Sequence, residues 1–421
     1  ILALVAAACG GSDGGSDEAV VEVETTEAPA TTEAPTTTAA PAPASDPLIL
    51  ASLMPLSGDL ASLGPGIALG AALAVEQINA AGGINGQPVQ LIEGDSGCDG
   101  AVALTSLNDV IAQGAQGVMG AACSGTSLAI LDTAIAAEVV MVSPSNTSPQ
   151  FTKIDKKGFY ARTAPSDLLQ GDVLASLLVE DGVQTVSIIS RADSYGRGLA
   201  EATAAAFEAA GGTVKTIVYH ATDATEFSSE VTAVGKGGAD AIVGILFPET
   251  GCGVLQPAFE QGLLDTPWYM TDGVKDAGLA SLCGLGTALD GFKGTAPGSA
   301  AGEAKDAFEA AYAEVSADGS PTFIFAPQAY DAVMLMAISA AANGVTGPEI
   351  ASGLVAASSG GEKCIGVACI ALAADGVDVD YVGASGEIEL NAVGDPTAAT
   401  YDIWTTEGDT NPVLKSVDFG S

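Results

Sequence analysis

Hydroxyl side chains gather in the run Cys-Ser-Gly-Thr-Ser at 123–127, between an apolar stretch at 116–120 and a helical pattern at 128–138. Backbone N–H groups at a helix start have no partner within the helix and lie at the positive end of its dipole. With the hydroxyls of Ser124 and Thr126 beside them, such groups suit a small carboxylate. Ser and Thr are also common helix N-caps. The run therefore predicts an anion site, a capped helix, or both together.

Nucleotide binding and catalysis have little support. Gly64, Gly66 and Gly70 follow a predicted strand, but their spacing is GxGxxxG rather than the GxGxxG of dinucleotide sites, and the sequence has no GxxxxGK[ST] motif. A serine nucleophile needs a base, and His220, the only histidine, lies on a predicted edge strand far along the chain from Ser124. The sequence has no CxxC pair for zinc. We expect no catalytic residue, no metal and no cofactor.

The composition excludes further classes of partner. The chain has 421 residues, 48% of them hydrophobic, which is enough for two domains with full cores. Its 13 basic and 52 acidic residues give a net charge of −39. Nucleic acid and anionic lipid are both bound through Lys and Arg. This balance therefore argues against nucleic acid and against a basic membrane-docking patch.

The first ten residues are apolar and end in small residues around Cys9. They resemble the end of a bacterial lipoprotein signal, with residues 1–8 as part of a signal peptide and a lipid on the Cys9 sulfur; a fragment of a plain helix is the alternative. Residues 9–47 are rich in Thr, Pro and Glu, so we expect a disordered tether. No internal run is long and apolar enough to span a bilayer. We predict an extracytoplasmic protein that contacts the outer face of the cell membrane through its lipid anchor only.

From residue 48 onward, short apolar stretches alternate with amphipathic patterns. Strands are expected at 48–54, 89–93, 139–143, 185–189, 214–219, 241–247 and 268–270, and helices at 66–81, 101–113, 198–210, 227–235, 254–261, 300–314 and 327–342. This alternation is typical of βαβ units around parallel sheets that are covered on both faces. Because the rhythm restarts near residue 185, we expect two doubly wound, Rossmann-like α/β lobes. Ligands of such sheets bind at the carboxyl ends of the strands.

Five segments, in order, resemble the leucine/isoleucine/valine-binding family, the type I solute-binding proteins of ABC importers. They are MPLSG at 54–58, AVEQINAAGGING at 74–86, MVSPSNTSP at 141–149, YGRG at 195–198 and YVGASGEI at 381–388. The resemblance implies the type I periplasmic binding protein fold, with a multi-strand hinge. One lobe would comprise 48–165 plus 295–396, and the other 166–294 plus 397–421. It also implies a monomer that binds an amino acid and delivers it to the permease subunits of an ABC importer.

The cysteine count fits an exported protein. Seven cysteines minus the lipidated Cys9 leave six, an even number that favours disulfide bonds outside the cytoplasm. Six thiols allow fifteen pairings. The resemblance and the order along the chain together imply three bridges, Cys98–Cys123, Cys252–Cys283 and Cys364–Cys369.

The resemblance also implies how a dipolar ligand is held. Residue by residue, the family's carboxylate-binding positions fall on Ser124 and Thr147, and its ammonium-binding positions on the Ser145 carbonyl and the Asp272 carboxylate. A zwitterion that loses its water must find partners for both charges. With Thr126 from the hydroxyl run, these residues form the predicted polar site. Thr147 and Asp272 also stand where ordinary turn residues are common.

The wall around the ligand's side chain is expected at Leu63 and Phe247, with Tyr195 closing the site; core packing is the alternative for each. Branched-chain binders of this family carry a Glu where Asp272 stands and often an aromatic residue where Leu63 stands. We therefore expect a branched-chain or similar aliphatic amino acid, with another small amide or carboxylate solute as the alternative. A ligand-sensing domain that acts with a partner receptor is the alternative function.

Overall fold

The structure is a computed structural model that describes residues 46–320 and 322–419. The expected signal segment 1–8, the lipidation site Cys9 and nearly all of the tether 9–47 lie outside the described residues. Among the described residues, no helix combines the length and the apolar character that crossing a membrane requires.

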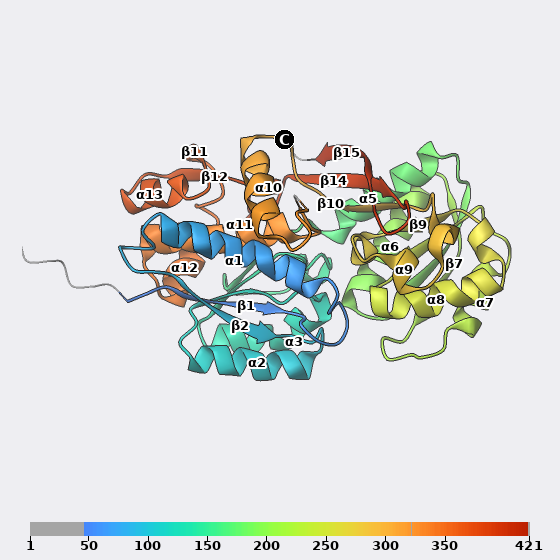
Figure 1. Ribbon diagram of the computed structural model, residues 1–421, viewed down its shortest axis with the longest axis horizontal. Coiled ribbons are helices and arrows are strands. Elements are labelled where there is room, and N and C mark those ends of the chain that lie inside the picture. Colours follow the sequence, from blue (N-terminus) through green and yellow to red (C-terminus); the bar gives the residue numbers. More distant parts are fainter. Residues whose placement is uncertain (1–45, 321, 420–421) are drawn as a thin grey trace, which may run out of the picture. The chain divides into compact units, whose positions relative to one another are not determined.

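The first sheet is five-stranded and parallel, in the order β2-β1-β3-β4-β5. Its strands are β1 Ile49–Met54, β2 Gln90–Asp95, β3 Gly117–Gly120, β4 Val140–Ser143 and β5 Tyr160–Arg162, and the helices that follow the first four are α1 Gly64–Ala80, α2 Gly100–Ala112, α3 Ser124–Ala136 and α4 Gln150–Lys153. Consecutive residues of a strand face opposite sides of a sheet. Val140 and Val142 accordingly pack in the core with α1, and Met141 packs in the core with α2 and α3. Helices therefore cover both faces of this sheet (Figure 1).

Later segments complete this half of the molecule. The helix α11 (Ala326–Asn343) packs on α1, β3 and β4, and Gly70 makes its close approach to α1 possible, since a Cβ there would lie 2.2 Å from the Ala326 carbonyl oxygen. Around α11 lie α10 Glu303–Val315, α12 Gly347–Gly353, α13 Ala368–Ala374 and a small sheet of β11 Glu362–Ile365, β12 Val379–Gly383 and β13 Gly386–Glu387. We call the first sheet with the elements packed on it the first lobe.

The second sheet has seven strands, in the order β15-β14-β10-β9-β8-β6-β7. Its strands are β6 Thr185–Arg191, β7 Thr213–His220, β8 Ala241–Ile245, β9 Trp268–Met270, β10 Lys293–Pro297, β14 Ala399–Thr405 and β15 Val413–Phe419. Its helices are α5 Asp167–Glu180, α6 Ser194–Ala209, α7 Ser228–Gly235, α8 Pro248–Glu260 and α9 Leu279–Leu282, with short 3₁₀ turns η1 Leu263–Asp265, η2 Asp272–Val274 and η3 Gly286–Leu289. The first five strands along the chain run parallel, and β14 and β15 extend the sheet antiparallel. This sheet and its helices form the second lobe.

The chain passes between the lobes at three places: from β5 to α5 along 163–166, from β10 to α10 along 298–302, and from β13 to β14 along 388–398. Two of these crossings share contacts with the start of α11. The Thr163 hydroxyl donates to the Gln328 carbonyl at 2.7 Å, and the Gln328 amide donates to the Gly298 carbonyl at 3.1 Å. Several thin connections of this kind make a hinge, so the predicted multi-strand hinge between two α/β lobes is confirmed.

The hydroxyl run 123–127 takes a different form from the one expected. It is the first turn of α3, which begins at Ser124 rather than at 128.

All three expected disulfide bonds are formed, with Cα–Cα distances of 5.5 Å for Cys98–Cys123, 4.9 Å for Cys252–Cys283 and 5.3 Å for Cys364–Cys369. The first of them ties the start of α3 to the loop after β2, which fixes the position of that helix start.

Candidate ligand-binding site

A small cavity lies between the lobes, where strands of both parallel sheets end. Its residues follow β1, β3 and β4 in the first lobe and β6, β8 and β9 in the second. The cavity has a volume of about 30 Å³, enough for about two waters. An amino acid needs more room than this, so the lobes must move apart to admit one. The cavity is lined by Leu60, Leu63, Ile67, Ala122, Cys123, Ser124, Ser145, Tyr195, Phe247, Asp272, Gly273 and Phe325.

The first-lobe side of the cavity is the start of α3. Its N-cap is Cys123, whose backbone is extended and whose side chain makes no capping hydrogen bond. The first N–H groups of the helix have no acceptor one turn earlier, so they remain available to an anion. Ser124 lines the cavity at this helix start, and Ser145 is held beside it by donating its hydroxyl to the Ala122 carbonyl at 3.1 Å. This side of the cavity therefore offers hydrogen-bond donors and the positive end of a helix dipole, and none of these groups carries a formal charge.

The second-lobe side carries one buried carboxylate, Asp272, directly after β9. Its Oδ1 accepts hydrogen bonds from the Gln170 amide at 2.7 Å and from the Tyr195 hydroxyl at 3.0 Å. Burial raises the pKa of Asp272 to about 6, although the Gln170 and Tyr195 hydrogen bonds pull it back. The side chain is therefore ionised at neutral pH in a place that disfavours an isolated charge. A cation in the cavity would stabilise it.

Aromatic and aliphatic side chains form the rest of the wall. The rings of Tyr195 and Phe247 are stacked, with their centroids 5.4 Å apart, and the Arg191 guanidinium lies 4.2 Å from the centre of the Phe247 ring. Leu60 and Leu63 face them from the first lobe. An apolar surface of this kind suits an aliphatic side chain better than a charged one.

Six of the eight predicted site residues line this one cavity: Ser124, Ser145, Tyr195, Asp272, Phe247 and Leu63. Thr126 and Thr147 do not line it. Thr126 is buried in the first turn of α3, and Thr147 is fully buried, with its carbonyl accepting from the Asp167 N–H at 2.8 Å. Because α3 carries no side-chain cap, Ser124 and Thr126 are not N-caps, so the capping alternative is excluded.

Gln170 is a functional candidate that the sequence analysis missed. It projects from α5, a helix that was not predicted, and reaches Asp272 across 102 residues of sequence. No motif or spacing marks it, because its importance comes from the packing of α5 beside β10, where its amide also approaches the Thr295 carbonyl at 3.2 Å. Leu60, Ile67 and Phe325 were missed for the same reason.

Replacing Gln170 with leucine should weaken binding of an amino acid about five- to tenfold at pH 7. The substitution removes a donor that fixes the Asp272 carboxylate and lowers its pKa. Titration calorimetry at pH 7 and pH 8 checks this: part of the loss should disappear at pH 8, where Asp272 is fully ionised. An equal loss at both pH values would contradict the effect on the pKa.

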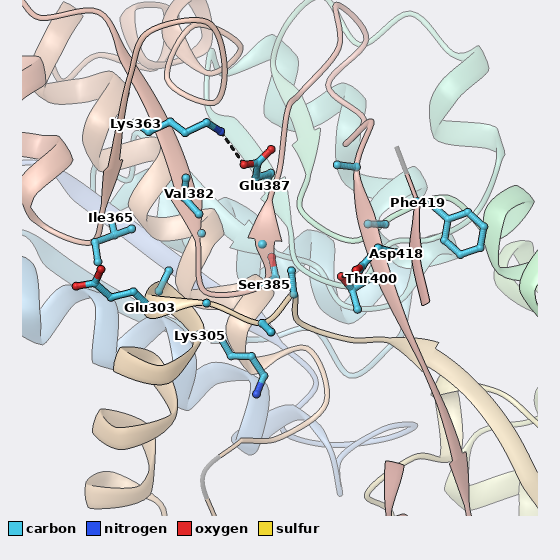
Figure 2. A pocket seen from close by; sticks show the side chains of 18 of the residues that line it. Glu303, Lys305, Lys363, Ile365, Val382, Ser385, Glu387, Thr400, Asp418 and Phe419 are labelled. Carbon is cyan, nitrogen blue, oxygen red and sulfur yellow. Dashed lines mark hydrogen bonds and ion pairs between the residues drawn. The ribbon is translucent and has the colours of Figure 1, made fainter. Parts of the chain in front are cut away.

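A larger cavity of about 530 Å³ lies elsewhere, between α10, the small sheet and the ends of β14 and β15. Figure 2 shows Lys363 and Glu387 of this cavity joined as an ion pair. Lys363 donates to Glu387 at 2.7 Å, and Asp418 accepts from the Thr400 hydroxyl at 2.6 Å. It contains none of the predicted site residues. Its two lysines, Lys305 and Lys363, are already paired with Glu309 and Glu387, so the smaller inter-lobe cavity is the better candidate for a ligand that carries a carboxylate.

Within residues 46–320 and 322–419, no group of three or more His, Cys, Asp or Glu side chains is placed to hold an ion. His220 ends β7 at the edge of the second sheet and is not one of the residues that line the inter-lobe cavity.

A family model described as periplasmic binding protein matches residues 47–363, three quarters of the chain. The chain belongs to the periplasmic binding protein family. The resemblance to its leucine/isoleucine/valine-binding branch is confirmed by curated relatives with such names. The family consists of solute-binding proteins.

Two relatives come from Pseudomonas aeruginosa. An "Amino acid binding protein" is 34% identical over 238 residues, which is 55% of this chain and 62% of that protein. A "Leucine-, isoleucine-, valine-, threonine-, and alanine-binding protein" is 29% identical over 304 residues, which is 70% of this chain and 78% of that protein. The alignment with the first relative thus spans less than two thirds of its length.

Solved structures agree on the fold. The branched-chain amino acid transporter substrate binding protein LivJ of Streptococcus pneumoniae, in complex with isoleucine, superposes with a TM-score of 0.74 at 22% identity and covers 89% of this chain and 100% of that one. At this identity the likeness establishes a two-lobed type I fold.

Proposed function

We propose that this protein is the extracytoplasmic solute-binding protein of an ABC importer and that it binds an amino acid with a branched or similar aliphatic side chain. One observation carries the proposal: a single cavity has an uncapped helix start on one side and a buried, ionisable Asp272 on the other. The ligand that matches both is a small molecule with a carboxylate at one end and an ammonium close by.

The two charges of such a ligand go to opposite lobes. The carboxylate meets the N–H groups and the Ser124 hydroxyl at the start of α3, and the ammonium meets Asp272 and the Ser145 carbonyl. Since a ligand shifts a conformational equilibrium only through its different affinity for the two states, contacts to both lobes are what favours the closed form. The surrounding Leu60, Leu63, Tyr195 and Phe247 take the aliphatic side chain.

The remaining roles follow from this function. We propose that the protein acts without chemical change to its ligand, as a monomer that hands the ligand to the permease subunits, and that the lobes move about the three crossings. A lipid on Cys9 and a tether over residues 9–47 would hold it at the outer face of the membrane. The acidic net charge of −39 argues against a nucleic-acid binder, and the description of the family as periplasmic supports an extracytoplasmic location.

A thermal-shift screen tests the ligand class. Leucine, isoleucine and valine at 1,000 times their Kd should stabilise the protein by about 4 kcal/mol and raise its melting temperature, whereas benzoate, which lacks an ammonium, and adenine nucleotides should not. Isovalerate is the matched control, since it is valine without the ammonium. A rise with isovalerate or benzoate equal to that with leucine would support the alternative of a plain carboxylate solute. No rise with any amino acid would overturn the proposal.

A further inference from the structure

Arg191 is a buried cation whose partners come from both lobes. It ends β6 in the second lobe and is only 2% exposed. Its Nε donates to Asp193 at 2.9 Å and one terminal nitrogen donates to the Thr250 hydroxyl at 3.1 Å, both within the second lobe. The other terminal nitrogen donates to Asp59 of the first lobe at 2.7 Å. The same guanidinium lies over the ring of Phe247, a wall of the ligand cavity.

Asp59 belongs to the segment 55–63, between β1 and α1, which we call the closure loop. The loop is anchored in its own lobe, since Asp95 accepts from the Leu56 N–H at 2.9 Å and from the Ser57 N–H at 3.2 Å. Leu60, next to Asp59, lines the ligand cavity with a left-handed backbone at φ 62°. For a non-glycine residue this conformation persists only where its surroundings hold it.

The closure loop thus faces two ways. Leu60 and Leu63 point into the cavity, whereas Asp59 and Ser62 contact the second lobe; Ser62 approaches Glu249 at 3.5 Å. Contacts to the ligand and contacts between the lobes are therefore made by alternating residues of one short segment. Whatever holds Asp59 against Arg191 also holds Leu60 over the ligand.

We propose that Arg191 is a positioning residue of the ligand site and that its ion pair with Asp59 is a latch that favours the closed form, an inference that rests on the proposed function. When the lobes separate, Arg191 loses Asp59 but keeps Asp193 and Thr250, so its charge stays paired in the open form. The latch therefore adds to closure without leaving an unpaired buried charge, which would be costly. Because Arg191 also supports Phe247, latching and the shape of the side-chain pocket are coupled.

Two matched variants separate a latch from an ordinary structural contact. Asp59→Asn removes the carboxylate of the first lobe from Arg191, and Asp193→Asn removes the carboxylate of the second lobe. Asp193 also caps α6 by accepting from the Gly196 N–H at 2.8 Å, and an Asn can take over that role. Each variant thus loses one negative charge beside the same guanidinium, and only the first crosses the lobes.

We expect titration calorimetry to show about tenfold weaker leucine binding for Asp59→Asn and a change of less than threefold for Asp193→Asn. Melting curves of both proteins without ligand verify that they are folded. Equal losses in the two variants, or no loss in Asp59→Asn, would overturn the latch.

A second readout does not depend on the ligand. Small-angle scattering of the ligand-free proteins should give Asp59→Asn a larger radius of gyration than the wild type and Asp193→Asn, because fewer molecules are closed. If the wild type binds no amino acid, the proposed function fails and this comparison alone decides the latch. Identical scattering from all three proteins would overturn it.

Discussion

Replacing Asp272 with asparagine should weaken leucine binding about 100-fold, or about 2.7 kcal/mol. The side chain keeps its size and can still accept the hydrogen bonds from Gln170 and Tyr195, so the site keeps its shape. What is lost is the negative charge opposite the ligand's ammonium. That ammonium would then be dehydrated in the closed site without an ionic partner, and this penalty accounts for most of the loss. Titration calorimetry at pH 7.5 measures it directly.

The stability of the ligand-free protein should change in the opposite direction. Burial raises the pKa of Asp272 from its ordinary value of 3.8 to about 6. A carboxyl group whose pKa is higher in the folded protein than in the unfolded chain binds its proton more tightly when folded. The contribution of Asp272 to the free energy of unfolding is therefore most favourable below pH 4. It falls by about 3 kcal/mol as the pH rises through 6. Asp272→Asn removes this cost, so its melting temperature at pH 7.5 should be higher than that of the wild type.

Opposite changes in affinity and stability distinguish a binding residue from a structural one, since a variant that merely misfolds loses both. Glu208→Gln is the control for charge, because Glu208 belongs to the same lobe but is exposed on α6 and does not line the cavity. It should change leucine affinity less than threefold. If Asp272→Asn binds leucine as tightly as the wild type, the ammonium does not lie at Asp272, and the polarity of the ligand in the cavity must be reassigned.

The alternation of strands and helices predicted the fold well because the burial of each strand and helix leaves a pattern in its own short stretch of sequence. A strand in a sheet covered on both faces must be apolar on both sides, as Val140, Met141 and Val142 are, and each helix must turn one apolar face to the sheet. Elements without such a pattern were missed. The helix α5 (Asp167–Glu180) is buried on much of its surface, including the polar Asp167 and Gln170, so no amphipathic stripe marks it.

The site was predictable where the resemblance supplied positions and unpredictable where tertiary packing decides. Asp272, Tyr195 and Ser124 reach one cavity because strand ends of both sheets meet there. Thr147 was expected in the cavity, but its carbonyl is bonded to the start of α5, and its side chain is fully buried and does not line the cavity. No sequence pattern marks Arg191 and Asp59, since an Arg at the end of one strand and an Asp in the loop after another become partners only when two lobes close on each other.

The affinity for leucine should fall as the medium is acidified from pH 7.5 to 4.5, by about 30-fold. Asp272 in the ligand-free protein has a pKa raised to about 6 by burial. A bound ammonium favours the ionised form and lowers this pKa by one to three units, so binding must release the proton that Asp272 carries below pH 6. The apparent affinity then falls about tenfold for each pH unit below 6, until the pKa of the complex is reached.

Two features of the titration make this dependence specific to Asp272. The ligand's own carboxyl group lies beside its ammonium, which lowers the carboxyl pKa below the value of about 3.5 that a peptide C-terminus has, so it stays ionised throughout the range. Asp167, whose pKa is also raised by burial and by the nearby charge of Asp272, does not line the cavity. In Asp272→Asn the affinity, already weak, should therefore stay constant between pH 7.5 and 4.5. A wild type that loses no affinity on acidification, or a variant that loses as much as the wild type, would show that another group receives the ammonium.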